Sequence, residues 1–293
     1  MDNLTHGITG VGIGFVAQEL LPGPDGGLII SAFLASQFPD LDVIIGAKSK
    51  VAYLKHHRGF SHSILLAPLY ALLIAFLVKL FFPYTNYGHL YLVSFLSIGL
   101  HLFLDLLNAY GTKLFWPLSN QRFAWDILMI IDPVILLVFG LGLGTYIFTR
   151  QEEILFSIFL ILALYILLML NFRFRARFFL KKKFANAKLC LLPPLLGWLK
   201  WNFIVEKGNT FYLGQIDAYS GKFYIKEELC PEKKCSSVLA TMNEPEVKVF
   251  LEFARFPWHS MQEVDREVVV KWSDLRYRLR ERDHFCLVTK LKK

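Results

Sequence analysis

The chain has 293 residues, 55% of them hydrophobic, and a mean hydropathy of +0.43. This composition excludes an ordinary soluble protein of this length. The net charge of +8 does not indicate nucleic-acid binding, because six basic residues form one acid-free cluster, Arg173–Lys183, directly after an apolar segment. Membrane topology and anionic lipid account for such a cluster.

Apolar residues concentrate between residues 8 and 171, where six hydrophobic segments can be drawn. The first is rich in Gly and carries Gln18 and Glu19, and it is either a spanning, a re-entrant or an interfacial segment. The predicted fold class is therefore an α-helical polytopic membrane domain of about six hydrophobic helices, over residues 1–172. The six segments cover about residues 8–21, 28–46, 63–82, 90–107, 127–148 and 154–171.

Lys and Arg residues in the short loops predict the orientation of these segments. Loops 47–62 and 108–126 and the cluster Arg173–Lys183 are basic, whereas loops 22–27 and 83–89 contain neither residue type. The bias is consistent from loop to loop. We therefore expect a multi-pass protein of the cell membrane with both termini in the cytoplasm.

A soluble domain is expected after the last segment. Residues 173–192 are predicted to be a basic juxtamembrane linker, and residues 193–293 a small cytoplasmic α+β domain with an antiparallel sheet. Its predicted helix begins after Asn243 as the N-cap. The helix is expected over 245–256 and the strands over 201–205, 211–216, 223–225, 264–272 and 285–291.

Four cysteines lie in this tail, and we expect them to be reduced in the cytoplasm. Cys230, Cys235, His284 and Cys286 could in principle supply four zinc ligands. Their spacing is wider than that of a zinc knuckle, which favours ordinary free cysteines.

The apolar stretch Leu90–Gly111 contains three polar side chains that stack on one helical face: His101, Asp105 and Asn108. An ionisable residue inside a membrane segment is costly, so its first interpretation is functional. A His and a carboxylate four residues apart can supply two ligands to one metal ion. The alternative is a His–Asp hydrogen bond that locks two helices together.

Further residues of catalytic type are predicted to reach the same membrane face. Asp40 and Asp42 in FPDLD can point at one site, although either could simply cap a turn. The stretch from His56 to His62 offers three imidazoles, and Arg58 suits two-point contact with a phosphate. The alternative is a hydrated loop whose side chains meet lipid headgroups. Ser61 is a candidate N-cap for the helix that follows.

Asp132 lies inside the fifth segment, just before Pro133. A buried carboxylate at this position needs a partner. Arg122, the metal site and backbone groups freed by the proline are the possibilities, the last of these being support for a helix kink.

The motifs MDNLTHGITG, FPDLD, HRGFSHS, HLFLDLLNAYGTKLFWP and IIDP, in this order between residues 1 and about 135, resemble the YdjM family of membrane-bound metal-dependent hydrolases. The tail is similar to the soluble domain of the family's YfhP-like branch. More distantly, the order of His and Asp residues resembles the zinc-dependent phospholipase C and S1/P1 nuclease class. The N-terminal Trp ligand of that class is absent, and no second HxxxD/E motif follows. The resemblance therefore implies a site for one or two ions, with candidate ligands His6, Asp40 or Asp42, His57, His62, His101 and Asp105.

Together these patterns predict a membrane-embedded hydrolase that acts on a phosphoester, such as a lipid, at the cytoplasmic interface. A divalent metal, with zinc favoured, would activate water. Whichever of Asp40 and Asp42 is not a ligand would serve as general base, and Arg58 would neutralise phosphate. The main alternative is a non-enzymatic membrane module with a structural metal or polar cluster and a partner-binding tail. A metal or proton transporter is a third possibility, disfavoured because the polar residues gather at one face.

Overall fold

The computed structural model describes residues 1–21, 26–46, 57–194, 198–230, 236–264, 267–278 and 286–292. The chain forms two compact units, which divide between Asn171 and Phe172. One helix, α8 (Glu152–Lys183), contributes to both. Cys235, His56 and His284 lie outside the described residues.

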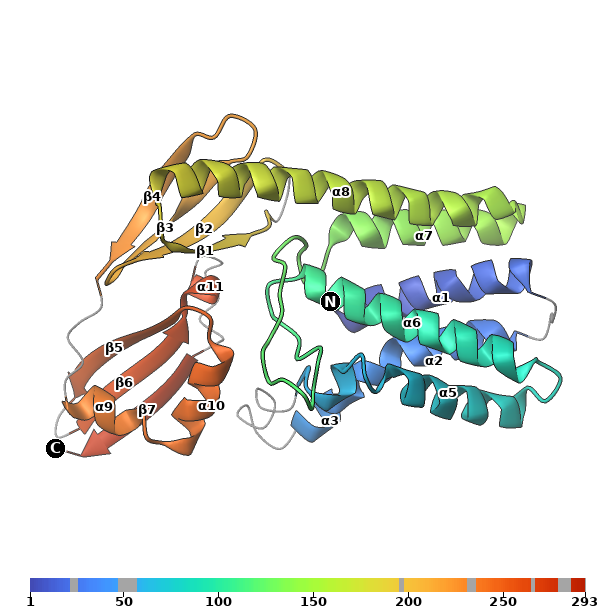
Figure 1. The fold of residues 1–293 in the computed structure, drawn as a ribbon, viewed down its shortest axis with the longest axis horizontal. Helices are drawn as coiled ribbons and strands as arrows, with labels where there is room; N and C mark the ends of the chain where they lie inside the picture. Colours follow the sequence, from blue (N-terminus) through green and yellow to red (C-terminus); the bar gives the residue numbers. More distant parts are fainter. Residues whose placement is uncertain are drawn as a thin grey trace. The chain divides into compact units, whose positions relative to one another are not determined.

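The first unit is helical (Figure 1). Each predicted hydrophobic segment overlaps one of its longer helices, and a buried apolar core joins four of them, α1, α2, α5 and α6. Two short 3₁₀ turns, η1 (Phe38–Asp42) and η2 (Phe60–His62), and the short helix α3 (Val43–Gly46) connect parts of this bundle. The longer helices are α1 (Asn3–Leu20), α2 (Gly27–Gln37), α5 (Ala67–Phe81), α6 (Tyr87–Leu107), α7 (Pro133–Thr149) and α8.

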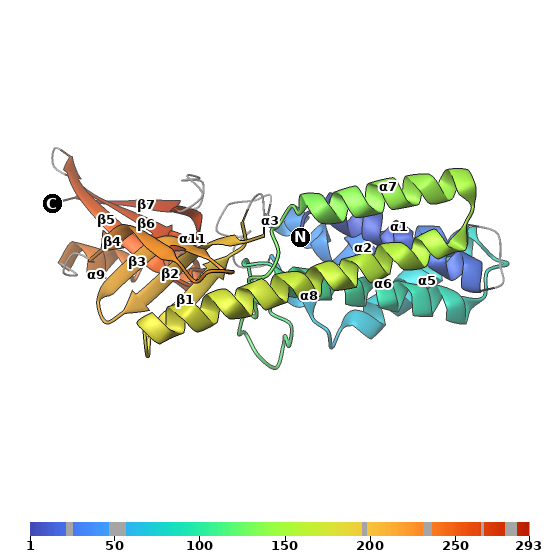
Figure 2. The ribbon, with the colours of Figure 1, turned by 90° about the horizontal axis from the view of Figure 1, so that it is seen from above.

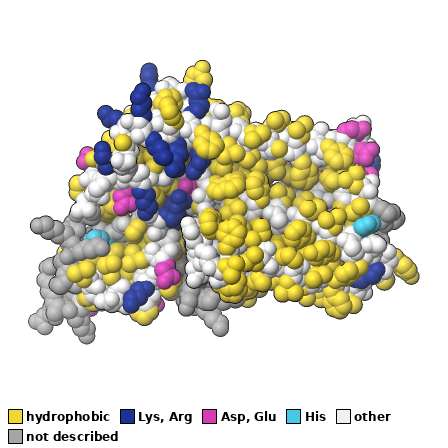
Figure 3. Space-filling view, in the orientation of Figure 1, with side chains coloured by type: hydrophobic (Ala, Val, Ile, Leu, Met, Phe, Trp, Pro, Cys, Tyr) yellow, Lys and Arg dark blue, Asp and Glu magenta, His cyan; other side chains and the backbone are white. Residues whose placement is uncertain are grey.

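Among the described residues, α6 and α8 are long and apolar enough to cross a membrane, while α5 and α7 are apolar but shorter. Hydrophobic side chains cover most of the visible face of this unit (Figure 3). Membrane spanning by each of the six longer helices stays a prediction.

Two expected segments are broken by proline. The α-helix of segment 28–46 ends at Gln37, because Phe38-Pro39 leads into the 3₁₀ turn η1, and only the short helix α3 follows. Segment 127–148 becomes helical only at Pro133, which occupies the first helical position. Asp132 is therefore not inside a kinked helix. It is the N-cap of α7, and its carboxylate accepts hydrogen bonds from the backbone N–H groups of Val134 and Ile135.

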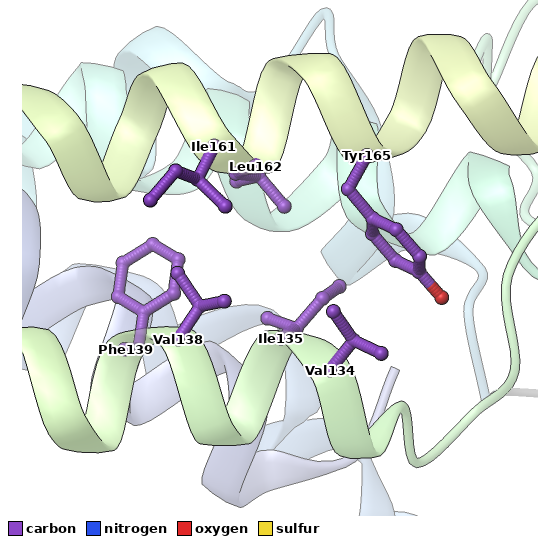
Figure 4. A pocket seen from close by; sticks show the side chains of 7 residues that line it. All are labelled: Val134, Ile135, Val138, Phe139, Ile161, Leu162 and Tyr165. Carbon is purple, nitrogen blue, oxygen red and sulfur yellow. The ribbon is translucent and has the colours of Figure 1, made fainter.

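The hydroxyl of Tyr165 on α8 donates to Asp132 at 3.0 Å, which ties α8 to the start of α7. Beside this contact, Figure 4 shows a small pocket between the two helices, lined by Tyr165 and by six apolar side chains, among them Phe139 and Leu162. The lining offers almost no polar chemistry, so we do not consider it a catalytic site.

In its described residues, the second unit contains two antiparallel sheets and three short helices. One sheet has the order β1-β2-β3-β4 and the other β5-β6-β7. Figure 2 shows the strands of the second unit from above. The strands are β1 (Lys188–Leu192), β2 (Lys200–Lys207), β3 (Thr210–Asp217), β4 (Phe223–Leu229), β5 (Pro257–Val264), β6 (Glu267–Asp274) and β7 (Cys286–Lys292); the helices are α9 (Ser236–Thr241), α10 (Pro245–Phe253) and α11 (Leu275–Arg278).

The region expected to be a linker is structured. Residues 173–183 continue α8, and β1 pairs along its whole length with β2. Strands β1 and β5 were not predicted, because KLCLL is short and lies close behind the basic cluster, and PWHSMQEV lacks regular apolar alternation. The N-cap of α10 is Glu244 and not Asn243, and it makes no side-chain capping bond.

Candidate metal centre

Residues from four separate parts of the chain meet at one buried place in the helical unit. His6 comes from α1, the two aspartates from η1, His57 and His62 from the loop around η2, and His101 and Asp105 from α6. Every one of these side chains is buried. The site therefore depends on the 3₁₀ turn after α2, which brings Asp40 and Asp42 to the face of α6 that carries His101 and Asp105.

Four ligand-type atoms converge in the first group of this cluster: those of Asp40, His62, His101 and Asp105. His62 Nε2 is central to it, at 3.3 Å from His101 Nε2, 3.2 Å from Asp105 Oδ2 and 3.4 Å from Asp40 Oδ1. His101 Nε2 lies 3.8 Å from Asp40 Oδ1 and 3.9 Å from Asp105 Oδ2. The i,i+4 pair predicted from the sequence thus faces one point.

Hydrogen bonds on the far side of each ring determine the tautomers. His101 Nδ1 lies 2.7 Å from the Ser36 carbonyl oxygen, which only accepts, so this nitrogen must donate. The Ser61 hydroxyl donates to Asp42 Oδ2 at 2.6 Å, and it therefore accepts from His62 Nδ1 at 2.9 Å. In the neutral rings, both Nε2 atoms then present lone pairs to each other.

In this arrangement no hydrogen atom lies between the two imidazole lone pairs and the two carboxylate oxygens, so these four atoms repel one another. Asp105 Oδ2 has no hydrogen-bond donor in the described part of the chain, and it is fully buried. A buried polar atom of this kind needs an explanation, and a bound cation is one. Nitrogen and oxygen donors in this number suit Zn²⁺ or a similar first-row ion. The residues fit a divalent metal.

A second possible ligand group adjoins the first and consists of Asp40, Asp42 and His57. Asp40 belongs to both groups. Asp42 is strongly held: Oδ1 lies 2.7 Å from His57 Nδ1, and Oδ2 accepts from the Arg58 backbone N–H at 2.9 Å. Burial works against ionisation of Asp42, but hydrogen bonds from His57 and His62 outweigh it and keep its pKa below the usual range. Burial lowers the pKa of His57, which favours the neutral ring that a metal requires.

The Arg58 side chain points into the cluster. Its guanidinium is buried over the Tyr110 ring, with Nη2 2.9 Å from Asp105 Oδ1 and Nη1 donating to Asn108 Oδ1 at 2.9 Å. The backbone at Arg58 is left-handed, with φ +56°. This conformation is uncommon outside glycine and marks a strained turn of the kind found at functional sites. Arg58, the Met1 amino group and Asn108 Nδ2 all contact Asp105 Oδ1, which leaves Oδ2 facing the histidines.

His6 borders the cluster without joining either ligand group. Its ring stacks on that of His101, with centroids 3.6 Å apart, and Nε2 lies 3.3 Å from Asp105 Oδ1.

The sequence did not indicate the supporting contacts of Ser36, Ser61 and Arg122. Ser61 supports Asp42 and His62 and does not cap α5, whose N-cap is Leu66. Arg122 donates to the His57 carbonyl at 3.2 Å. A hydrogen bond to a backbone carbonyl leaves no pattern of residue types in the sequence, so it could not be predicted.

Residues 1–176 match the family described as YdjM inner membrane protein, and this range includes every candidate site residue. The chain belongs to this family. Residues 236–293 match the YfhP C-terminal alpha/beta plait domain. The chain is 26% identical over 287 residues to a Bacillus subtilis (strain 168) protein named Uncharacterized protein YfhP, an alignment covering 95% of this chain and 87% of that protein.

No solved structure matches the chain. The resemblance to the YdjM and YfhP families is thus confirmed, while these comparisons show no similarity to the phospholipase C class.

Proposed function

We propose that the chain is a membrane-embedded, metal-dependent hydrolase that acts on a phosphoester at the cytoplasmic membrane surface. The observation that carries this proposal is the convergence of four buried ligand-type atoms from Asp40, His62, His101 and Asp105. The adjoining ligand group favours a hydrolase rather than a site for one structural ion, because Asp40 is common to both groups. A carboxylate shared between two ion positions suits the two-metal sites of phosphatases and nucleases.

When bound, a divalent metal supplies Lewis acidity that lowers the pKa of water and polarises a phosphoryl oxygen. The chain's own residues keep the donors ready for this role. The Ser36 carbonyl and Ser61 hydroxyl hold His101 and His62 in the tautomers that expose Nε2. Asp42 already accepts from three donors, so it anchors the His57–Ser61 loop. This leaves Asp40, which is common to both ligand groups, as the carboxylate that would hold metal or accept a proton from water.

A lipid phosphoester is the substrate class that suits a site carried by helices of a membrane family, because lipid headgroups are the phosphates closest to it. The expected topology, with both termini cytoplasmic, would place the site on the inner leaflet. The loop charge bias supports this orientation.

One observation favours a second candidate, a non-enzymatic module with a structural metal. The four donors of the first group all come from the protein and all are buried. Structural zinc sites are typically closed in this way, whereas catalytic ones keep a position open for water.

The deciding experiment measures metal content and hydrolysis together. Protein purified in detergent without chelator is analysed by inductively coupled plasma mass spectrometry, as wild type and as His101→Ala. His89→Ala is the matched control, because His89 lies on the same helix outside the cluster. We expect metal in the wild type and control only, together with hydrolysis of at least one member of a lipid phosphoester panel.

The outcomes separate the two candidates. Bound metal that depends on His101, without hydrolysis of any panel lipid, would favour the structural module. Wild-type protein that is metal-free and stays inert with added Zn²⁺ or Mn²⁺ would contradict both.

A further inference from the structure

The last turns of α8 carry a surface that the proposed metal centre does not use. Residues 172–183 contain six Lys or Arg residues and no acidic residue. One face of this stretch is buried in the second unit: Ala176 and Leu180 have no exposed surface, and the Phe179 ring lies against Gly221. Arg175 donates to the carbonyl oxygens of two residues in the turn before Gly221.

The opposite face is aromatic and basic. Phe174 and Phe178 lie four residues apart and are 60% and 66% exposed. At 100° per residue, Lys181 lies on one side of this aromatic pair and Lys182 on the other, and both lysines are exposed. We call the four residues together the Phe–Lys stripe. Two large aromatic rings exposed side by side on a basic helix form an apolar patch, which indicates an apolar contact.

The Phe–Lys stripe continues a lipid-facing line of the same helix. Leu160, Leu164 and Leu167 are exposed on the apolar part of α8, and Asn171, Phe174 and Phe178 follow at the same alternating spacing of three and four residues. In a helix that is apolar enough to cross a membrane, this exposed line is the lipid contact. Its continuation past Asn171 extends the contact into the basic region.

The length of α8 places that basic region at the membrane surface. Its 32 residues span about 48 Å at 1.5 Å per residue, whereas the hydrocarbon core is about 30 Å thick. Figure 3 shows Lys and Arg side chains gathered beside hydrophobic ones over the end of α8 that lies in the second unit.

We propose that the Phe–Lys stripe binds the headgroups of anionic phospholipids. Phe174 and Phe178 would enter the boundary between headgroups and acyl chains, where aromatic rings are enriched. Lys181 and Lys182 would contact lipid phosphates, assisted by the neighbouring basic residues. This combination of an apolar face with flanking lysines is typical of helices that lie at a membrane surface. An acidic protein partner would satisfy the lysines but would leave the continuation of the lipid-facing line unexplained.

The test uses the full-length chain in nanodiscs of phosphatidylcholine alone or mixed equally with phosphatidylglycerol. Phe178 is replaced by the photocrosslinker p-benzoylphenylalanine, and Tyr224, an exposed aromatic residue of β4, is replaced in the same way as a control. Crosslinked products are identified by mass spectrometry. Position 178 should give phospholipid adducts, and position 224 should give few.

The charge requirement is tested with Lys181→Gln, Lys182→Gln and Lys183→Gln combined. Lys207→Gln, Lys226→Gln and Lys248→Gln remove the same charge from exposed positions elsewhere in the unit. At position 178, we expect the ratio of phosphatidylglycerol to phosphatidylcholine adducts to exceed the ratio of the two lipids in the nanodisc by about threefold. This preference should disappear in the variant that lacks Lys181, Lys182 and Lys183, and at about 1 M salt, where screening is strong. Adducts to protein only, adducts no more frequent than at position 224, or lipid adducts without a phosphatidylglycerol preference would each overturn the proposal.

Discussion

Asp105 divides its two carboxylate oxygens between different partners. Oδ1 lies 2.9 Å from Arg58 Nη2, whereas Oδ2 faces His62 and accepts no hydrogen bond in the described part of the structure. A carboxylate held at one oxygen presents the other in a fixed direction, which is the usual effect of contacts behind a metal ligand. Arg58 is thus placed to orient Asp105, although its residue type had suggested phosphate binding.

This arrangement predicts that Arg58→Gln weakens metal binding without abolishing it. Loss of an orienting contact of this kind typically costs about 10–100-fold in metal affinity. The measurement is a Zn²⁺ titration against a competing chelator on monodisperse protein. Arg150→Gln, at the junction of α7 and α8, is the control and should bind like the wild type. Equal affinity in wild type and Arg58→Gln would show that Asp105 needs no such support.

The sequence revealed the residues of the cluster better than their contacts. His101 and Asp105 could be paired in advance because helical pitch relates positions four apart. Asp40, Asp42, His57 and His62 could be assigned to the same face by topology. The bonds of Arg58 and Ser61 could not be foreseen, because they depend on the left-handed backbone at Arg58 and on the 3₁₀ turns, which no periodic pattern encodes.

Close contact between helices α1 and α2 fixes the position of Ser36, which contacts the ligand-type residue His101. A Cβ atom on Gly14 would lie 2.6 Å from the Ile29 Cα atom, so only glycine fits there. Gly10 likewise lies against Ser36, whose carbonyl orients His101. The packing of α1 against α2 therefore influences the position of His101 on α6.

Gly14→Ala should lower thermal stability, because the new methyl group collides with backbone that cannot move aside; overpacking of this type costs about 1–3 kcal/mol. Gly140→Ala, on α7, is the matched control, since no atom lies within 4 Å of its added Cβ. The measurement is the thermal unfolding midpoint of both variants in detergent. A midpoint for Gly14→Ala equal to that of the control would mean that α1 and α2 are less tightly packed than described.

Elements were predictable where an apolar run or strand alternation was regular. The six hydrophobic segments contain helices, and β2, β3, β4, β6 and β7 lie where strands were expected. The failures have local causes. Pro39 and Pro133 shortened two helices, and the apolar run of β1 was hidden by the basic cluster before it.

At the scale of the whole molecule, the loop charges predict that both termini are cytoplasmic. Tyr84 lies in an uncharged loop and is 94% exposed, and Cys230 is exposed in the second unit. A membrane-impermeant maleimide added to intact cells should therefore label Tyr84→Cys, and should label Cys230 only after permeabilisation. Labelling of Cys230 in intact cells would reverse the orientation and move the proposed site to the other leaflet.

The boundary of the second unit leads to a prediction about independent folding. A fragment starting at residue 193, the boundary expected from Pro193-Pro194, lacks β1 and so leaves an edge of β2 unpaired. It also lacks Phe184, which packs on Tyr212 and Phe223, and the buried Leu180. Burial of each such side chain contributes about 1.5–3 kcal/mol, which is a large share of the stability of a small domain.

We therefore expect fragment 172–293 to fold cooperatively, 186–293 to be less stable because it keeps β1 but loses the helix, and 193–293 to be largely unfolded. Urea denaturation followed by tryptophan fluorescence ranks the three, and amide chemical-shift dispersion shows which are folded. Equal midpoints for the two longer fragments would mean that the end of α8 contributes nothing to this unit. In that case its aromatic and basic residues would be left with the membrane surface as their only role.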